Sequence, residues 1–194
     1  MPLINQHQVI DNVKSAMISI HDQKLAHIYT AENTADYVDA TEILIDYRPV
    51  EFSEKHPPKP QLQGDDLQAL GQRKNNKKLG IILSGASDYQ ILADDLDKVL
   101  PVLDVIVIDF HGFRDGRGYS LAQAIRQHPQ FNPTTVLRAS GDILPDTLQL
   151  LAEVGFTEFK IADNGFNNAW FEYFNDIEHT YTGRSVSQLP MFTK

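Results

Sequence analysis

The chain has 194 residues, of which 42% are hydrophobic, and a chain of this length can bury about 70% of its unfolded surface, which predicts a single globular domain. The formal net charge of -9 at pH 7 disfavours nucleic acids and anionic membrane surfaces as partners. The absence of cysteine excludes a thiol nucleophile, cysteine-bound zinc and a cysteine-ligated iron–sulfur cluster, and fits a cytoplasmic protein.

The first part of the chain, residues 1–77, reads as irregular additions to a core. Up to residue 42 the pattern is ambiguous, because one stretch fits either a helical face or a strand around Ile18 and Ile20. The N-terminus lacks the basic and apolar regions of a signal peptide, and no apolar run approaches the roughly 20 residues of a membrane span. Residues 42–48, EILIDYR, predict a strand.

Prolines interrupt the chain after this strand. The sequence HPPKP forbids a regular helix or a central strand, so residues 53–65 are expected to form a surface loop. Residues 66–78 follow as a weak helical stretch that ends in the polar run RKNNKK.

The core is predicted over residues 78–163, where apolar runs of strand length alternate with segments of helix length. One helix-length segment separates each pair of strands, which is typical of βαβ units with parallel strands. The sequence therefore predicts an α/β fold with a mostly parallel sheet. The shape stays open between an open sandwich and a partial barrel, which side-by-side consecutive strands would produce. The predicted strands are 79–83, 104–110, 134–139 and 157–162.

Two S-x-x-Q sequences have the form of a capping box and predict the starts of helices. The first begins at Ser87, and its helix is expected to end at Pro101. The second begins at Ser120, and its helix is expected to stop before Pro129.

Two further helices are expected towards the C-terminal part of the sequence. Pro145 suits the first turn of one helix, and Gly155 suits its left-handed C-cap. Residues 164–194 should form another helix and an extended tail. Four apolar residues recur there on one helical face, which predicts packing on the sheet or, alternatively, a face for a partner: Trp170, Tyr173, Phe174 and Ile177.

Polar residues follow the predicted strands, so a parallel sheet would gather them at one edge, where α/β proteins form binding sites. Three arginines would lie beside helix starts, and guanidinium groups and free N–H donors both bind oxyanions. The predicted ligand-binding residues are Arg114, Asp115, Gly116, Arg117, Gly118, Tyr119, Ser120, Arg138, Gly141 and Asp142. Also near this edge stand Ser84, Gly85, Ser87, His111, Ser140, Lys160 and Asp163.

A purely structural interpretation competes with the anion site. Arg117 and Arg138 could instead pair with nearby aspartates and hold the loops in place, and the sequence leaves the two interpretations open. The candidate partners are Asp109, Asp115 and Asp142.

Known catalytic and cofactor motifs do not appear. GRGYSL contains only the first two glycines of GxGxxG, and the phosphate-loop motif is missing. Aspartates at strand ends could hold Mg²⁺, but this signal is unspecific and no metal ligand is assigned. The sequence shows no nucleophile–base–acid triad. Catalytic residues and cofactors therefore stay unassigned.

Two segments resemble a bacterial family often encoded beside the haemoprotein of assimilatory sulfite reductase. They are FRDGRGYSLA at 113–122 and LRASGDILPD at 137–146, followed by Gly155, Phe156 and Phe159. The resemblance covers about residues 79–162. Val154 stands where the family usually has a cysteine, so a cysteine-based role is ruled out here. The chain departs from the family pattern at four positions, which are Gly112, Pro145, Thr147 and Val154.

The resemblance implies a role in sulfur assimilation. The family's oxidoreductase label rests on gene neighbourhood, so whether the chain is an enzyme stays open. The leading hypothesis is an accessory protein of sulfite reduction that binds a small anion or anionic cofactor. The alternatives are a non-catalytic docking protein for sulfite reductase or its electron donor, and a metal-assisted enzyme acting on a phosphorylated or carboxylated metabolite. A homodimer is compatible with each hypothesis.

Overall fold

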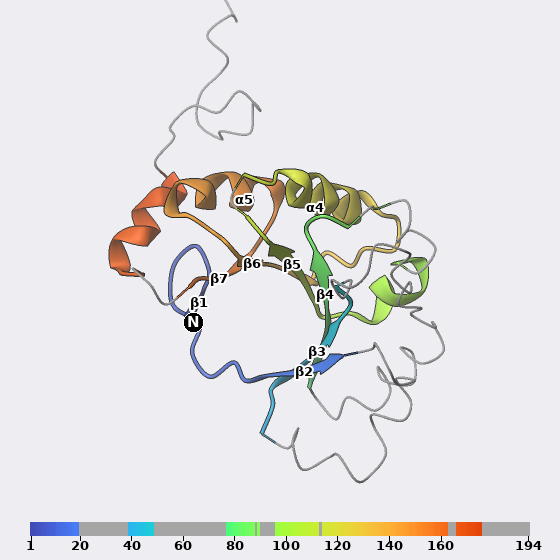
Figure 1. Ribbon diagram of the computed structural model, residues 1–194. Coiled ribbons are helices and arrows are strands. Elements are labelled where there is room, and N and C mark those ends of the chain that lie inside the picture. Colours follow the sequence, from blue (N-terminus) through green and yellow to red (C-terminus); the bar gives the residue numbers. More distant parts are fainter. Residues whose placement is uncertain are drawn as a thin grey trace, which may run out of the picture.

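The computed structural model describes residues 1–19, 39–48, 77–87, 89, 96–112, 114–162 and 166–175. Within these ranges the strands form one seven-stranded sheet in the order β1-β7-β6-β5-β4-β3-β2. The sheet is curled into an arc and makes a half-barrel (Figure 1). Its strands are β1 (Leu3–Ile4), β2 (Ser15–Ser19), β3 (Glu42–Asp46), β4 (Lys78–Ser84), β5 (Val105–Phe110), β6 (Val136–Gly141) and β7 (Glu158–Lys160).

The sheet is mixed rather than wholly parallel. Every neighbouring pair from β2 to β7 is parallel, which confirms the parallel pairing predicted for the four core strands. β1 pairs antiparallel with β7, with Ile4 opposite Phe159. From β2 to β7 the order in the sheet follows the order in the chain, and the sheet takes the curved alternative of the two shapes left open by the sequence.

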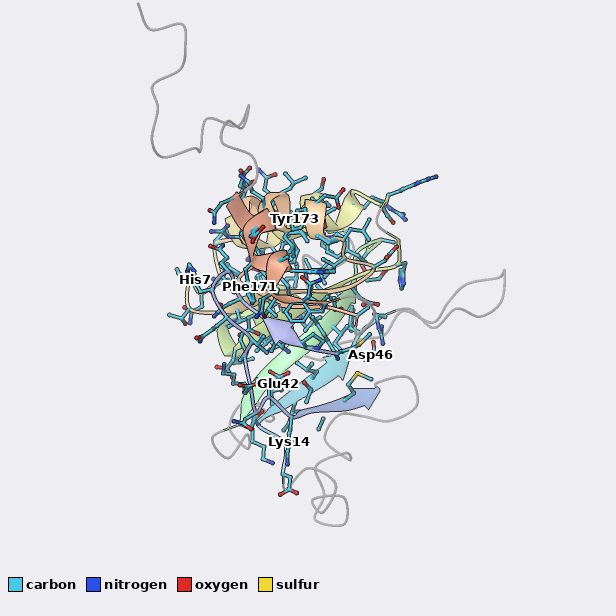
Figure 2. The ribbon with its side chains drawn as sticks, turned by 90° about the vertical axis from the view of Figure 1, so that its left-hand side faces the viewer. His7, Lys14, Glu42, Asp46, Phe171 and Tyr173 are labelled. Atoms are coloured by element: carbon cyan, nitrogen blue, oxygen red, sulfur yellow. The ribbon has the colours of Figure 1, made fainter. Side chains whose placement is uncertain are left out.

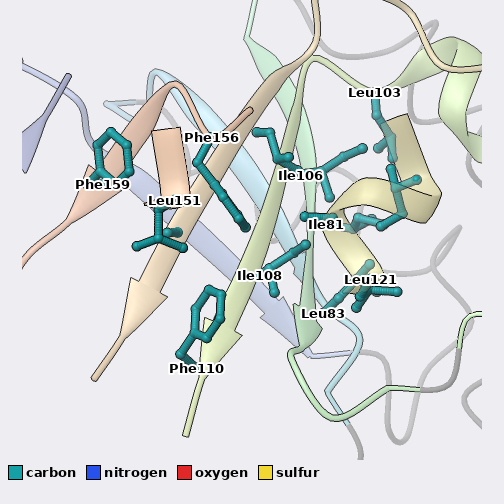
Figure 3. Packing of buried hydrophobic residues seen from close by; sticks show 14 of the residues in the cluster. Ile81, Leu83, Leu103, Ile106, Ile108, Phe110, Leu121, Leu151, Phe156 and Phe159 are labelled. Carbon is teal, nitrogen blue, oxygen red and sulfur yellow. The ribbon is translucent and has the colours of Figure 1, made fainter. Parts of the chain in front are cut away.

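The helices lie outside the arc and cover its convex face (Figure 1). α4 (Arg117–Gln127) connects β5 to β6, and α5 (Leu148–Val154) lies between β6 and β7. Every second residue of a strand points to the same face, so one set of apolar side chains meets the helices. Figure 3 shows this main core, which includes Ile81, Leu83, Ile106, Ile108, Leu121, Leu151 and Phe156.

The concave face carries a second, smaller apolar cluster. Parallel strands that are buried on both faces read as continuous apolar runs, which explains why the strands are so visible in the sequence. The cluster occupies the middle of the inner face and consists of Leu44, Ile82, Val105 and Val107, with Val136 packed against it.

The N-terminal region is part of the sheet, which corrects the expectation of an irregular region. The strand alternative around Ile18 is right, because β2 spans Ser15–Ser19. β1 was not predicted, because a two-residue strand leaves no periodic pattern. It is fixed by long-range pairing, and the Ile161 N–H donates to the Pro2 carbonyl at 3.0 Å. The segment between β1 and β2 runs along the open side of the arc (Figure 1).

Two predicted boundaries shift by a few residues. α4 begins at Arg117, so Ser120 lies inside the helix and does not cap it. The N-cap is Gly116, which provides no side-chain cap, and Asp115 Oδ1 accepts the Arg117 N–H at 3.1 Å just before the helix. β6 begins two residues later than predicted, because Asn132 Oδ1 accepts the Thr134 N–H at 3.0 Å and holds a turn before the strand.

Two of the remaining helices contain a 3₁₀ segment where the prediction had only α-helix. The helix before β5, described over residues 96–99, passes at Leu100 into a short 3₁₀ turn, η2 (Leu100–Val102), which contains Pro101. Pro145 opens η3 (Pro145–Thr147), which continues into α5, and Gly155 ends α5 with φ of 115°, as predicted.

The last helix, η4 (Asn168–Asn175), is a 3₁₀ helix rather than an α-helix. Its Trp170 and Phe174 are buried in the main core, which supports the packing interpretation for these two residues, whereas Tyr173 of the same predicted face is 37% exposed and Ile177 lies outside the described residues. Several predictions fall outside the described residues: the capping box after Ser87, the proline loop, the helix of 66–76 and the tail from 176. No helix among the residues described is both long and apolar enough to cross a bilayer.

Candidate functional site

A row of polar side chains crosses the concave face where the parallel strands end. Ser84 of β4 is in register with Asp109 of β5, and Asp109 is in register with Ser140 of β6. The Ser140 hydroxyl donates to Asp109 Oδ1 at 2.7 Å. Residues paired across neighbouring strands point to the same face, so the strands place these groups side by side.

Arg48 follows β3 and holds two carboxylates of this row. Its Nε and Nη2 donate to the two oxygens of Asp46 at 2.9 and 2.7 Å, while Nη1 donates to Asp109 Oδ2 at 2.8 Å. The hydrogen bonds with Asp46, and those with Asp109, raise the pKa of Arg48 against the opposing effect of burial. Both oxygens of Asp109 therefore accept a hydrogen bond, one from Arg48 and one from Ser140.

His111 stands over the end of β4. Its Nε2 lies 3.0 Å from Ser84 Oγ, and its Nδ1 lies 4.0 Å from Asp109 Oδ2. The His111 side chain is 56% exposed, whereas Ser84 is buried. The Ala86 N–H also donates to Ser84 Oγ, at 3.2 Å.

The loop after β5 carries an ion pair between predicted site residues. Arg117 Nε lies 2.9 Å from Asp115 Oδ1, and Arg117 Nη2 lies 2.6 Å from Oδ2, which is the two-pronged geometry of a guanidinium on a carboxylate. Side-chain hydrogen bonds from Arg117 hold the pKa of Asp115 at about 2, and the charge of His111 acts in the same direction. The Arg117 side chain is 67% exposed, so this pair faces solvent.

The glycines of the predicted loop serve backbone packing. A Cβ on Gly118 would lie 2.4 Å from the ring of Phe110, so α4 can approach β5 only with glycine there. Gly141 has φ of +93° and lies against the Phe110 carbonyl, which also accepts the Asp142 N–H at 2.8 Å. A Cβ on Gly116 would meet nothing within 4 Å.

Tyr119 packs against the same ring and completes this contact between helix and sheet. The centroids of the Tyr119 and Phe110 rings are 5.4 Å apart in an edge arrangement. Burial raises the pKa of Tyr119, with Thr147 opposing and Asp146 reinforcing that shift. Tyr119 thus joins α4 to β5 and to the turn before α5.

Arg138 lies apart from the loop, deep in the concave face. Its Nη1 and Nη2 donate to the two oxygens of Glu42 at 2.6 and 2.9 Å, and its Nε donates to Glu158 at 2.8 Å. The Ser15 hydroxyl also donates to Glu42, at 2.5 Å. Glu42 begins β3, while Asp46 ends it (Figure 2), so this network belongs to the opposite end of the half-barrel from Arg48.

The structure therefore divides the predicted site residues. Asp115 and Arg117 are brought together, and His111 acts on the same carboxylate. Ser120, Arg114 and Asp142 are exposed near the same edge, whereas Arg138 is buried elsewhere. Arg138 does have carboxylate partners, as the structural interpretation expected, but they are Glu42 and Glu158 rather than the aspartates named for that role.

Sequence reasoning missed the residues that come from distant strands. Arg48, Glu42 and Glu158 lie far from the predicted loop in sequence, and only the order of strands brings them to the inner face. Ser84, Asp109 and His111 had a usable signal. Ser84 and Asp109 each end an apolar run, and His111 follows Asp109 by two residues, just after the end of β5.

Among the described residues, no group of three or more His, Cys, Asp or Glu side chains could hold a metal ion.

Comparison with known proteins gives a family. No curated protein matches the chain. A family model described as a bacterial protein of unknown function, DUF934, matches residues 80–192, which is more than half of the chain. The match begins in β4 and takes in Ser84, Asp109 and the loop with Asp115 and Arg117. The chain therefore belongs to the DUF934 family of bacterial proteins of unknown function.

Proposed function

We propose that this protein binds a small oxyanion at the loop between β5 and α4, and that it serves assimilatory sulfite reduction as an accessory protein. The observation that carries the anion proposal is the two-pronged contact of Arg117 with Asp115. An internal carboxylate occupies the guanidinium in the geometry that a bound oxyanion would adopt. The resemblance to proteins encoded beside sulfite reductase supports the sulfur context, in which sulfite itself is such an oxyanion.

The surroundings of Arg117 would allow an oxyanion to displace the Asp115 carboxylate from the guanidinium. The ion pair lies in solvent, where such pairs contribute little to stability, so the carboxylate can be displaced at low cost. The first N–H groups of α4 lie beside Arg117, and a helix start adds favourable donors for an anion. His111 adds a second cation to the same place when it is protonated.

Thermal unfolding in oxyanion solutions tests the proposal. A ligand that binds only the native state raises stability in proportion to ln(1 + [L]/Kd), so sulfite, sulfate or phosphate should raise the melting temperature more than chloride does at equal ionic strength. Asp115→Asn should strengthen this effect, because the variant removes the competing carboxylate. Arg117→Ala should abolish it, and Arg117→Lys should weaken it, because lysine keeps the charge without the planar fork.

Arg126→Gln provides the matched control, since Arg126 lies at the far end of α4 and should leave the anion effect unchanged. Oxyanion and chloride curves that coincide in both the wild type and Asp115→Asn would contradict anion binding.

Docking to sulfite reductase or its electron donor is the second candidate. It is favoured by the finding that Arg138, predicted as part of the anion site, is instead buried against Glu42 and Glu158. Titration of the protein with purified sulfite reductase, followed by calorimetry, separates the two proposals. If the protein only docks, its binding to sulfite reductase should depend neither on oxyanion nor on Arg117. If it has the accessory role, oxyanion should change that binding, and Arg117→Ala should alter this change.

A further inference from the structure

Ser84, His111 and Asp109 lie in line at the carboxyl end of β4 and β5. Ser84 and Asp109 are register partners on neighbouring parallel strands. His111 follows the end of β5, and its ring contacts Ser84 and faces Asp109. The resulting distances are 3.0 Å from Ser84 Oγ to His111 Nε2 and 4.0 Å from His111 Nδ1 to Asp109 Oδ2.

We propose that Ser84 and His111 form a nucleophile–base pair that transfers a small acyl group from an ester to water. A serine hydroxyl is a weak nucleophile until a base within hydrogen-bond reach takes its proton, and the distance to Nε2 falls within that reach. The outer contact to Asp109 is longer than a hydrogen bond. Catalytic hydrogen bonds are often long before substrate binds and tighten in the complex.

The carboxylate behind His111 is held in place by its own partners. Arg48 Nη1 and the Ser140 hydroxyl each donate to one oxygen of Asp109, at 2.8 and 2.7 Å. These bonds come from Ser140 of β6 and from Arg48, which follows β3, so two other parts of the sheet fix the group that the imidazole faces. Ser84 and Asp109 lie on strands, which keep their geometry better than loops do.

The burial of Ser84 limits the size of the substrate. Ser84 is 2% exposed and lies beneath His111, so only a small electrophile can reach its Oγ. We therefore assign the pair to short acyl esters, such as acetyl esters. The Ala86 N–H donates to Ser84 Oγ at 3.2 Å and is the donor that we assign to a developing oxyanion.

The reaction balances without a redox partner. Ser84 Oγ attacks the ester carbonyl carbon, its proton moves to His111 Nε2, and the bond to the leaving alcohol breaks as His111 returns that proton to it. Water then attacks the acyl-serine, gives one proton to His111 and forms the carboxylic acid. The Ser84 hydroxyl regains its proton from His111. The pair stands whether or not the loop binds an oxyanion, because Arg117 takes no part in these steps.

Labelling with methanesulfonyl fluoride, a small serine-directed reagent, tests the proposal. Ser84 attacks the sulfur and fluoride leaves, so intact-mass and peptide analysis should locate one methanesulfonyl group on Ser84. Ser84→Ala should lose the label, and His111→Gln should slow labelling at least tenfold. Ser15→Ala, which removes an exposed serine of β2, is the matched control and should label as the wild type does.

The His111→Gln variant keeps the test decisive if Ser84→Ala folds poorly. Because His111 is 56% exposed, its replacement should leave the fold intact by circular dichroism. Labelling of Ser84 no faster than of Ser15, or equally fast in His111→Gln, overturns the proposal. Hydrolysis of p-nitrophenyl acetate that persists in Ser84→Ala overturns it as well.

Discussion

The buried guanidinium of Arg138 binds two carboxylates, and this environment gives Arg138 a structural role. Its side chain is 3% exposed and that of Glu42 is 1% exposed, so water cannot screen either charge. Glu42 and Glu158 come from β3 and β7, which lie on either side of β6 in the arc. A buried charge is tolerated only when it is paired, so this network ties distant strands of the half-barrel together.

Arg138→Ala should therefore destabilise the protein strongly. The variant leaves two carboxylates without their cation, and breaking a buried ion pair by removing one partner costs about 3–5 kcal/mol. Urea unfolding monitored by circular dichroism measures the loss. Arg117→Ala is the matched control, because its ion pair is exposed and its removal should hardly move the unfolding midpoint. Equal midpoints for the two variants would show that the inner network adds nothing to stability.

Glu42 should make stability depend on pH. Burial raises its pKa, but the hydrogen bonds and charge of Arg138 outweigh burial, so the pKa lies below its usual value of 4.5. A carboxylate with a lowered folded pKa stabilises the fold fully above its unfolded pKa, and this stabilisation is lost as pH falls through the folded pKa. The free energy of unfolding should thus decrease as pH drops below about 4.5.

Glu42→Gln provides the comparison for this pH effect. The variant should be less stable at neutral pH, and its difference from the wild type should shrink as the solution becomes acidic. Urea unfolding at a series of pH values gives both curves. Curves that run parallel throughout would mean that Glu42 does not carry the linkage.

At the scale of elements, the contact of α4 with β5 depends on one missing side chain. Gly118 lies on the first turn of α4, directly against the ring of Phe110. Tyr119 closes over the same ring from the next position. The motif that looks like part of a cofactor loop thus sets the distance between a helix and a strand.

Gly118→Ala should overpack this contact. The added Cβ would fall 2.4 Å from the Phe110 ring, and inserting a methyl group into a well-packed core typically costs about 1–3 kcal/mol. Thermal unfolding should show a lower midpoint, and Phe110→Leu should recover part of the loss in the double variant. Gly112→Ala is the control, because a Cβ there meets nothing within 4 Å. An unchanged midpoint for Gly118→Ala would refute the packing role.

At the scale of the whole molecule, the parallel strands could be predicted because burial on both faces leaves continuous apolar runs. Ile106 and Val107 face opposite sides of the sheet, and both are buried. β1 could not be predicted, because its two residues pair in a ladder with β7, which lies far along the chain, while their local contact is an isolated bridge from Ile4 to Val9. Local sequence carries no signal for such a pairing.

The candidate site could be predicted only where it is local in sequence. Asp115 and Arg117 are two residues apart, so their loop was visible. The partners of Asp109 come from β6 and from the segment that follows β3, and those of Arg138 come from β3 and β7. Which buried charges meet inside a half-barrel depends on strand order and stagger, and a single sequence states neither.

The antiparallel seam between β1 and β7 has a consequence for how the protein is made. β2 to β7 neighbour one another in the order in which a ribosome produces them, so each new strand finds its partner already present. β1 emerges first, yet Ile4 must wait for Phe159. At about 5–20 residues per second, that delay is on the order of ten seconds. During translation Ile4 can therefore form its local bridge with Val9 early, but its pairing with β7 closes only after β7 has left the ribosome.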